Sequence, residues 1–326
     1  MRLSASETIS IAQTAGFDTG MIEKVIHLFN ILNLISENSF LKNQFVLKGG
    51  SALNLFHYNL PRLSIDIDLN YIGELDRTKM IEKRPKVEQI LQAILSRENY
   101  VVKRNPSEHA GGKWRIQYVN YSGQTSNLEI DINYMFRQPL WESQTLTSIK
   151  LGTYCVKSFQ ILNIHELAAG KMAAMFSRHQ ARDLFDVYKL LTCSELNDSY
   201  LRKAFVVYGA FNRKDWRKIS LEDIDFDPKE IQMSLSPVLQ KQSLPEGTTI
   251  LNYAKQMIKK CREKISIVFP FSKQEMLFLD KILAKGIIEP SLITDNPVLQ
   301  NRIMHHPLLH WKVKNVRSFI KTKKLM

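Results

Sequence analysis

The sequence predicts an α+β fold, in which a mixed sheet is flanked by helices and followed by a helical C-terminal region. Two observations support this prediction. Short segments that alternate apolar and polar residues, as strands do, are concentrated between residues 45 and 159. Longer segments with apolar residues at helical spacing lie before, between and after them. Beyond residue 195 we expect only helices and loops. The sequence therefore predicts a first domain at 1–195 and a basic, mainly helical second domain at 196–326.

The N-terminal part of the chain is expected to supply the first two strands of the sheet and the helices around them. Residues 6–38 carry apolar side chains at helical spacing and are expected to form one or two helices. Residues 45–47 read as a short strand that ends at a Gly-Gly pair, and residues 51–58 then favour a helix. Residues 65–69 are rich in good strand formers and favour the next strand.

The remaining elements follow the same patterns. A helix is expected over residues 77–98, with Pro85 at an early turn or in the first helical turn, where its missing N–H costs little. Four strands are expected, the last of them an edge strand, at 100–103, 113–121, 128–136 and 155–159. The segment 122–127, SGQTSN, favours a hairpin turn. Two further helices are expected over 164–178 and 182–191, and prolines punctuate a loop at 226–248.

The composition argues against a membrane or secreted protein. The 326 residues include 44% hydrophobic ones, enough for a substantial core, but no run of 18 apolar residues that would span a bilayer. The N-terminal segment lacks the apolar core of a signal peptide. The three cysteines have no metal-ligand spacing and fit reduced thiols. We therefore expect a cytoplasmic protein with no membrane association.

The most informative segment runs from Lys48 to Leu69, KGGSALNLFHYNLPRLSIDIDL. Asp66 and Asp68 lie two apart in an aliphatic run, so on a strand both carboxylates would project from the same face. Two like charges this close repel each other unless a cation lies between them. The pair therefore indicates a divalent metal site, and oxygen ligands without cysteine suit Mg²⁺.

The turn before these acids adds a phosphate-binding feature. Glycines at 49 and 50 permit a sharp turn and the close approach of a ligand. The helix expected to start at Ser51 would present free backbone N–H groups, which attract phosphate. A phosphate cradle followed by paired metal-binding carboxylates indicates chemistry on a nucleoside triphosphate.

This run resembles the nucleotidyltransferase superfamily, and GGSAL followed by RLSIDIDL is most similar to its AbiEii-type (MenT-like) toxin family. The resemblance implies a nucleotidyltransferase-type mixed sheet, with residues 1–195 as the catalytic core. It implies an enzyme that transfers a nucleoside monophosphate (NMP) from a nucleoside triphosphate (NTP), with Mg²⁺ or Mn²⁺ as cofactor and release of pyrophosphate. It also implies a toxin of a toxin–antitoxin or abortive-infection system, with a cognate antitoxin as partner.

The resemblance assigns further residues around the aspartate pair. Asp131 lies on the polar face of the expected strand 128–136 and is the candidate third metal ligand and general base. Glu129 shares that face and is an alternative, and a plain solvent-exposed strand face is another. The nucleotide-binding set comprises Gly49, Gly50, Ser51, Arg62, Ser64, Lys171 and Asp186. Arg62 would either brace the carboxylate strand or reach phosphate.

A lysine and an Arg-Asp segment complete the family pattern. Lys171 in LAAGKMAAMF is expected to contact the triphosphate. In RDLFDVYKLL, Asp183 would be the last active-site acid and Asp186 a supporting one. The alternatives are a lysine that snorkels from an apolar helix face and an acid that caps a helix start. Arg178 and Arg182 would pair with phosphate or with these acids.

The net charge of +13 is concentrated at one end of the chain. Residues 250–326 hold 15 of the 45 Lys and Arg residues but 5 of the 32 Asp and Glu residues. Such a cluster favours an RNA backbone as partner, the alternatives being a solvated helical face and, more weakly, a membrane surface.

The family suggests the 3′ end of tRNA as acceptor, which would block aminoacylation and translation. Two other functions stay open: nucleotidyl transfer to a protein or small molecule, and a catalytically silent nucleotide- or RNA-binding regulator. The retained acids together with Lys171 argue against the regulator.

Overall fold

A computed structural model describes residues 3–240 and 243–324. The chain forms two compact units. The first unit comprises Met1–Arg137, Ser143–Leu162 and Val238–Leu244, and the second comprises Gln138–Glu142, Asn163–Pro237 and Pro245–Met326. The division at residue 195 stays a prediction.

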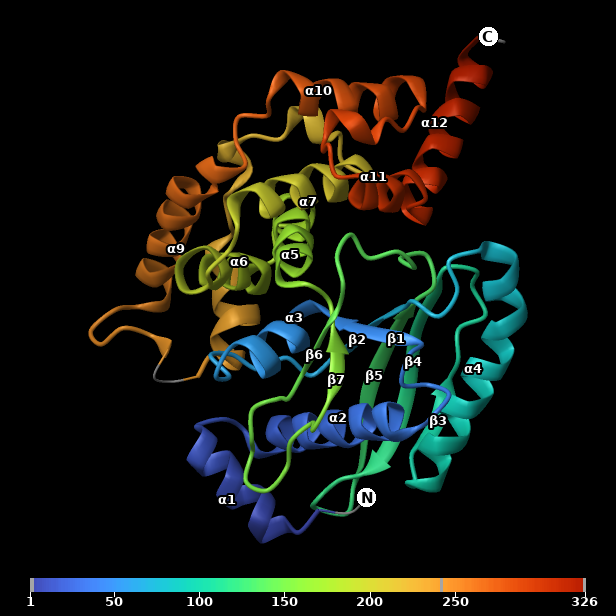
Figure 1. Cartoon of the computed structure of the whole chain (residues 1–326). Coiled ribbons are helices and arrows are strands. Elements are labelled where there is room, and N and C mark those ends of the chain that lie inside the picture. Colours follow the sequence, from blue (N-terminus) through green and yellow to red (C-terminus); the bar gives the residue numbers. More distant parts are fainter. Residues whose placement is uncertain (1–2, 241–242, 325–326) are drawn as a thin grey trace. The chain divides into compact units, whose positions relative to one another are not determined.

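The first unit is built around the expected mixed sheet, which has seven strands in the order β3-β4-β5-β2-β1-β7-β6 (Figure 1). The strands are β1 (Phe45–Lys48), β2 (Ile67–Tyr71), β3 (Val101–Arg104), β4 (Gly111–Val119), β5 (Thr125–Asn133), β6 (Gln144–Leu146) and β7 (Phe159–Ile161). β2–β5 and β1–β7 pair in parallel, and the other neighbours are antiparallel. β4 and β5 form the expected hairpin.

The helices of the first unit follow the expected order. They are α1 (Ala5–Ala15), α2 (Thr19–Glu37), α3 (Gly49–Ala52) with a π-helical continuation η1 (Leu53–His57), and α4 (Arg77–Arg97). The side chains of Asp18 and Asp76 cap α2 and α4, each accepting a backbone N–H of the first turn.

The two faces of the sheet differ in polarity because strand residues alternate. On β5, Leu128, Ile130 and Ile132 are buried, whereas the residues between them are half-buried. α2 and α4 cover the apolar face: His27 of α2 packs on Tyr118, and Arg84 of α4 lies over the ring of Tyr134. The opposite face carries the polar residues of β2, β4 and β5, and among them the predicted acids.

Two local predictions for the first unit were wrong. Pro85 lies well inside α4 rather than near its start. It is on the exposed side of the helix, where water can hydrate the carbonyl that its missing N–H leaves unpaired. The strand expected at 155–159 begins only at Phe159, and it lies between β1 and β6 rather than at the edge. Backbone and side-chain bonds to Ser148 hold Val156 in the preceding loop.

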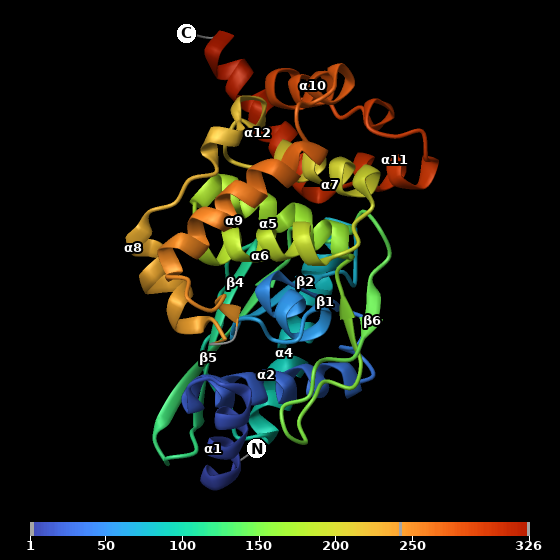
Figure 2. The same cartoon turned by 90° about the vertical axis from the view of Figure 1, so that its left-hand side faces the viewer.

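The second unit is helical. Its longer helices are α5 (Ile164–Arg178), α6 (Ala181–Cys193), α7 (Asp198–Ala210), α9 (Ile250–Lys264), α10 (Lys273–Asp280), α11 (Pro297–Met304) and α12 (Pro307–Lys324). Short helical turns link them: η2 (Trp216–Lys218), η3 (Leu221–Asp223), α8 (Pro228–Glu230), η4 (Ile231–Leu235), η5 (Ser236–Val238), η7 (Ile265–Ile267), η8 (Lys281–Lys285) and η9 (Pro290–Leu292). Within this unit α5 packs on α6 and α7, and α9 packs on α6 (Figure 2).

A buried glutamate fixes the segment Gln138–Glu142 to the start of α5. The Glu166 carboxylate accepts the backbone N–H groups of Leu140 at 2.9 Å and Trp141 at 3.1 Å, and the hydroxyl of Tyr208 at 3.1 Å. Burial raises the pKa of Glu166 to about 7, although these three donors oppose the rise.

No helix among the described residues is long and apolar enough to cross a membrane.

Candidate active site

The Gly-Gly turn brings the end of β1 against the start of β2. Gly49 has a φ of +75°, a conformation that favours glycine, and a Cβ atom there would collide with the carboxylate of Asp68. A Cβ atom at Gly50 would lie 2.7 Å from both the Arg62 guanidinium and the Ser64 hydroxyl. Both glycines are therefore required for this close approach, whatever ligand the turn binds.

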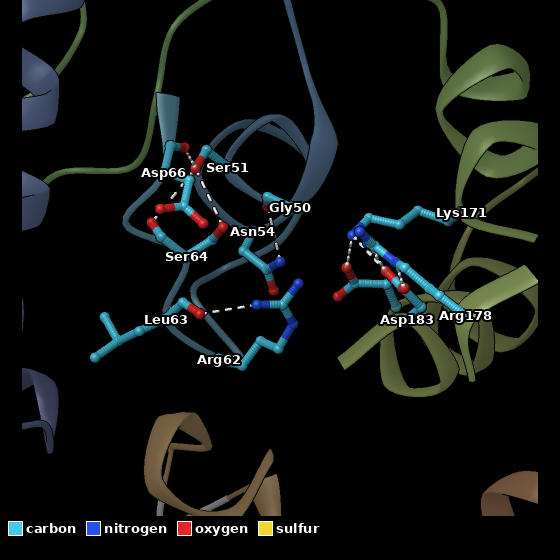
Figure 3. A network of polar contacts seen from close by, with 11 residues as sticks. Gly50, Ser51, Asn54, Arg62, Leu63, Ser64, Asp66, Lys171, Arg178 and Asp183 are labelled. Carbon is cyan, nitrogen blue, oxygen red and sulfur yellow. Dashed lines mark hydrogen bonds and ion pairs between the residues drawn. The ribbon is translucent and has the colours of Figure 1, made fainter. Parts of the chain in front are cut away.

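The side chains beneath the turn brace it. The buried Ser51 hydroxyl donates to the backbone carbonyl of Asp66 and, at 3.2 Å, to the Ser64 hydroxyl (Figure 3). Arg62, only 2% exposed, donates to the carbonyl of Leu63 at 2.8 Å. This placement favours the bracing role of Arg62 over contact with phosphate. Asp66 itself lies one residue before β2 rather than within it.

Four charged residues form a row across neighbouring strands on the polar face of the sheet. Lys48 of β1 pairs in register with Asp68 of β2, Asp68 with Asp131 of β5, and Asp131 with Lys113 of β4. Lys48 Nζ lies 4.0 Å from Asp68 Oδ1. We call these residues the Lys–Asp–Asp–Lys row. The expected juxtaposition of Asp131 with the aspartate pair thus arises from the parallel pairing of β2 and β5.

The carboxylates in and next to the row lie close enough to repel one another. Burial raises the pKa of Asp131, and the negative charges of Asp68 and Asp66 raise it further. Lys48 and Lys113 act in the opposite direction without cancelling the rise. A bound cation would remove this unfavourable energy, which is the behaviour expected of metal-binding acids.

Glu129, the alternative to Asp131, is already engaged. Lys113 Nζ donates to its carboxylate at 2.8 Å, and Arg115 lies 3.6 Å from it. The hydrogen bond from Lys113 holds the pKa of Glu129 below its ordinary value. Glu129 is thus a stable ionised partner of the two cations, which makes Asp131 the better candidate for metal and proton chemistry.

The donor set fits Mg²⁺ or Mn²⁺ in chemistry, because Asp66, Asp68 and Asp131 offer only carboxylate oxygens. Among residues 3–240 and 243–324, however, no three His, Cys, Asp or Glu side chains are grouped closely enough to form a ready-made metal site. The binding of a metal by these three acids therefore requires their side chains to turn toward one another.

The predicted residues of the second unit form a separate charged cluster between α5 and α6. Lys171 Nζ lies 3.1 Å from Asp183 Oδ1 and 2.7 Å from Asp186 Oδ2. Arg178 makes a forked pair with Asp183, at 2.6 and 2.9 Å (Figure 3). Burial alone would raise the pKa of Asp183, but Lys171 and Arg178 hold it below its ordinary value. The two acids are 1% exposed and pair with cationic side chains, whereas a helix cap requires only a bond to a backbone N–H.

Sequence reasoning missed Lys48 and Lys113 as parts of the site. The alternation of β4 places Lys113 opposite the buried Trp114, and Lys48 directly precedes the Gly-Gly pair. Both positions could be read as polar-face residues. Their alignment with the aspartates, however, depends on strand order and register, which a single sequence does not specify.

Comparison with known proteins gives the family of the chain. The sequence model described as "Nucleotidyl transferase AbiEii toxin, Type IV TA system" matches residues 33–260. Among solved structures, the nucleotidyltransferase toxin MenT4 of Mycobacterium tuberculosis H37Rv has a similar fold, with a TM-score of 0.65 at 15% identity over 93% of this chain and 98% of that one. No curated protein sequence matches significantly. The chain therefore belongs to the AbiEii family of nucleotidyltransferase toxins, enzymes that use an NTP and are paired with an antitoxin.

Proposed function

We propose that this chain transfers an NMP from an NTP to the 3′-terminal hydroxyl of tRNA, in a reaction that depends on Mg²⁺ or Mn²⁺. The observation that carries the proposal is the in-register pairing of Asp68 with Asp131 on adjacent parallel strands. The modified tRNA would no longer accept an amino acid, so translation would stop. Because tRNA is its acceptor, the proposed site of action is the cytoplasm.

Asp66, Asp68 and Asp131 would hold the metal. When bound, the metal neutralises charge on the triphosphate and on the departing pyrophosphate. The Gly49–Gly50 turn would lie against the triphosphate, since the absence of side chains there allows close approach. Ser51, Ser64 and Arg62 would support this turn from beneath, as their hydrogen bonds indicate.

Asp131 is the proposed general base. Its carboxylate would accept the proton of the acceptor hydroxyl while that oxygen forms a bond to the α-phosphorus. The bond from the α-phosphorus to the bridging oxygen would break, and pyrophosphate would leave. Its place in register with Asp68 supports this role, because a carboxylate beside the metal ligands lies where the acceptor hydroxyl would meet the α-phosphorus.

Lys171, Asp183 and Asp186 complete the proposed machinery. Lys171 would contact the triphosphate, with Asp183 as the last active-site acid and Asp186 as its support. The ion pairs between α5 and α6 favour a lysine whose position is fixed rather than one that moves in solvent. The side chain is 12% exposed, so it stays accessible to a ligand.

The test is a labelling experiment with the purified chain, each α-³²P-labelled NTP, Mg²⁺ and total tRNA. We expect label in tRNA, lost on chelation and restored by Mn²⁺, with Asp68→Asn as the inactive control. Label in a protein or small molecule instead would support the alternative acceptors. The absence of any label, with NTP binding retained, would indicate a silent nucleotide-binding regulator.

A further inference from the structure

The basic charge of residues 250–326 is divided between two separate parts of the second unit. α9 and α12 carry most of the lysines, and they lie on opposite sides of this unit (Figure 1). The two helices differ in character. On α9, Lys260 pairs with Glu263 at 2.9 Å, and Tyr253 is buried. The sequence of α12, PLLHWKVKNVRSFIKTKK, contains no acid at all.

One side of α12 anchors the helix. Leu309 and Val313 are buried there. Lys312 donates to the carbonyl of Asn212 at 2.6 Å, and the Arg317 guanidinium donates to the carbonyl of Gly286 at 2.8 Å. These contacts lie within the second unit and use two of the basic residues for attachment. The opposite side of the helix is therefore fixed in an outward orientation.

That outward side carries exposed aromatic rings and exposed lysines. Trp311, Lys314 and Lys321 follow one another at intervals of three and seven residues, which places them on one stripe of a helix. Trp311 is 42% exposed, and Phe319, which lies about 80° around the helix from Trp311 on the flank away from the two lysines, is 69% exposed. The ammonium groups of Lys314 and Lys321 have no ion-pair partner among the described residues. We call these four residues the α12 face.

We propose that the α12 face binds unpaired nucleotides of the RNA acceptor, an inference that rests on the proposed function. Single-stranded nucleic acid is bound by aromatic side chains that stack on bases and by cations that follow the phosphates. The α12 face supplies both, and a polyanion suits a helix without acids. Trp311 and Phe319 are eight residues apart, about 12 Å along the helix axis, so each ring would stack on a different base.

The features that make this face specific are the rings rather than the charge alone. α9 is also basic, with five Lys and Arg residues against one Glu, but its exposed surface carries no aromatic residue among those described, so it serves as an internal comparison. Lys323 and Lys324 extend the basic run of α12. Their side chains lie outside the described residues.

The experiment measures tRNA binding by fluorescence anisotropy as a function of salt, with intact tRNA and with tRNA lacking its unpaired 3′ nucleotides. Three double variants of the full chain are compared: Trp311→Ala/Phe319→Ala, Lys314→Gln/Lys321→Gln, and the α9 control Lys255→Gln/Lys259→Gln. All substituted side chains of α12 are exposed, so circular dichroism should show unchanged folding.

We expect the aromatic variant to lose roughly tenfold or more in affinity for intact tRNA, with an unchanged salt slope. The lysine variant should flatten the salt slope by roughly 0.7 for each lost phosphate contact. The α9 control should bind as wild type. Removal of the unpaired nucleotides should weaken wild-type binding and leave the aromatic variant unaffected.

Two kinds of result would overturn the inference. The first is an aromatic variant that binds intact tRNA as tightly as wild type, or one that labels tRNA with the same KM for tRNA as wild type. In that case the proposed function would stand without the RNA-binding face. The second is another occupant: a wild-type dimer that dissociates in the aromatic variant, or loss of antitoxin binding with RNA binding intact. If wild type labels no RNA but the aromatic variant still loses RNA affinity, the proposed transfer fails and the RNA-binding face is supported.

Discussion

Asp131 is the side chain on which the proposed chemistry depends most, and the fold holds it at an energetic cost. Its pKa is raised by burial and by the neighbouring carboxylates. We predict that Asp131→Asn abolishes nucleotidyl transfer and leaves the stability of the metal-free protein at pH 7 unchanged or higher, because the repulsion with Asp68 is removed. Transfer is measured with labelled NTP and stability by calorimetry.

The pH dependence provides the control for this substitution. The pKa of Asp131 is higher in the folded protein than in the unfolded chain. Wild type therefore loses stability relative to Asp131→Asn as the pH rises through the folded pKa, and the two proteins converge below the unfolded value. An Asp131→Asn protein that is inactive because it melts well below wild type would refute a purely chemical role.

Lys171 carries a structural role as well as the proposed one. Two nearly buried carboxylates depend on it, and the removal of one partner of a buried pair leaves uncompensated charge. We predict that Lys171→Met lowers the stability of the second unit by roughly 3–5 kcal/mol. The double variant Lys171→Met/Asp186→Asn should recover a large part of this loss. The measurement is urea unfolding followed by circular dichroism.

This prediction separates two interpretations of an inactive Lys171 variant. If Lys171→Met unfolds at the same urea concentration as wild type, the lysine does not stabilise the acids and is held for substrate alone. If the double variant recovers stability but not NTP binding, measured by calorimetric titration, both roles of Lys171 are supported.

The Gly-Gly turn is the element on which the geometry of the first unit depends. Gly49 and Gly123 both have positive φ, +75° and +83° respectively, but a Cβ at Gly123 meets nothing within 4 Å. Gly123→Ala should therefore cost only backbone strain, roughly 1 kcal/mol. We predict that Gly49→Ala costs at least about 1 kcal/mol more, because its methyl group displaces the Asp68 carboxylate, and that it also loses transfer activity.

Thermal melts and the labelling assay on this pair of variants distinguish a required turn from a permissive one. Equal melting temperatures for the two alanine variants would show that the turn relaxes without disturbing Asp68. Loss of activity in Gly123→Ala would show that the turn of the β4–β5 hairpin affects the site beyond its placement of Asp131 and Lys113.

The start of α5 should make the second unit sensitive to pH. The pKa of Glu166 is raised from an ordinary value of 4.5 to about 7. Its contribution to stability is therefore fully present below about pH 4.5 and is lost as the pH rises through 7, by about 3 kcal/mol in all. We predict that Glu166→Gln is less stable than wild type at pH 5, because one backbone N–H loses its acceptor, and that it lacks this pH dependence.

Urea unfolding at a series of pH values between 5 and 8 tests the role of Glu166. A wild-type protein whose stability is flat over this range, or a Glu166→Gln protein with the same slope as wild type, would contradict the assignment. Tyr208→Phe is the matched control, because it removes one donor to the carboxylate and keeps the titrating group.

Local patterns predicted elements well where periodicity and caps agreed, and poorly where tertiary contacts decided. The helix expected over 164–178 is observed with those bounds, and the alternation of β5 correctly separated its buried and polar residues. β6, with three residues, was too short to show a pattern. The π-helical turn after α3 and the interior position of Pro85 depend on packing and solvent exposure, which the sequence does not encode locally.

The candidate site was predictable as a list of residues but not as an arrangement. Asp66, Asp68 and Asp131 follow from spacing and from family resemblance. The lysines that flank them follow from the order β4-β5-β2-β1, which brings together segments far apart in the chain. In the second unit, the left-handed residue His179 ends α5 and lets α6 turn back, so that Lys171 meets Asp183 and Asp186. Residues with φ above 0 are rarely predictable when they are not glycine.

For the molecule as a whole, the Lys–Asp–Asp–Lys row predicts that the fold does not depend on metal. Each aspartate has a lysine as a strand neighbour, so the row carries no net charge without a cation. We predict that EDTA abolishes transfer but shifts the melting temperature by less than about 2 °C. A large decrease in melting temperature on chelation, reversed by Mg²⁺, would show instead that the metal is part of the fold.

The register of β2 couples the packing of the sheet to the alignment of the Lys–Asp–Asp–Lys row. A slip of β2 by one residue would send Asp68 into the apolar layer and bring Ile67 and Leu69 to the polar face of the sheet. Burial of an unpaired carboxylate costs several kcal/mol, so chains with this error would not stay folded. The register that buries the apolar residues of β2 is therefore the same one that aligns its acid with Asp131, so a protein with a correctly packed sheet also has a correctly aligned site.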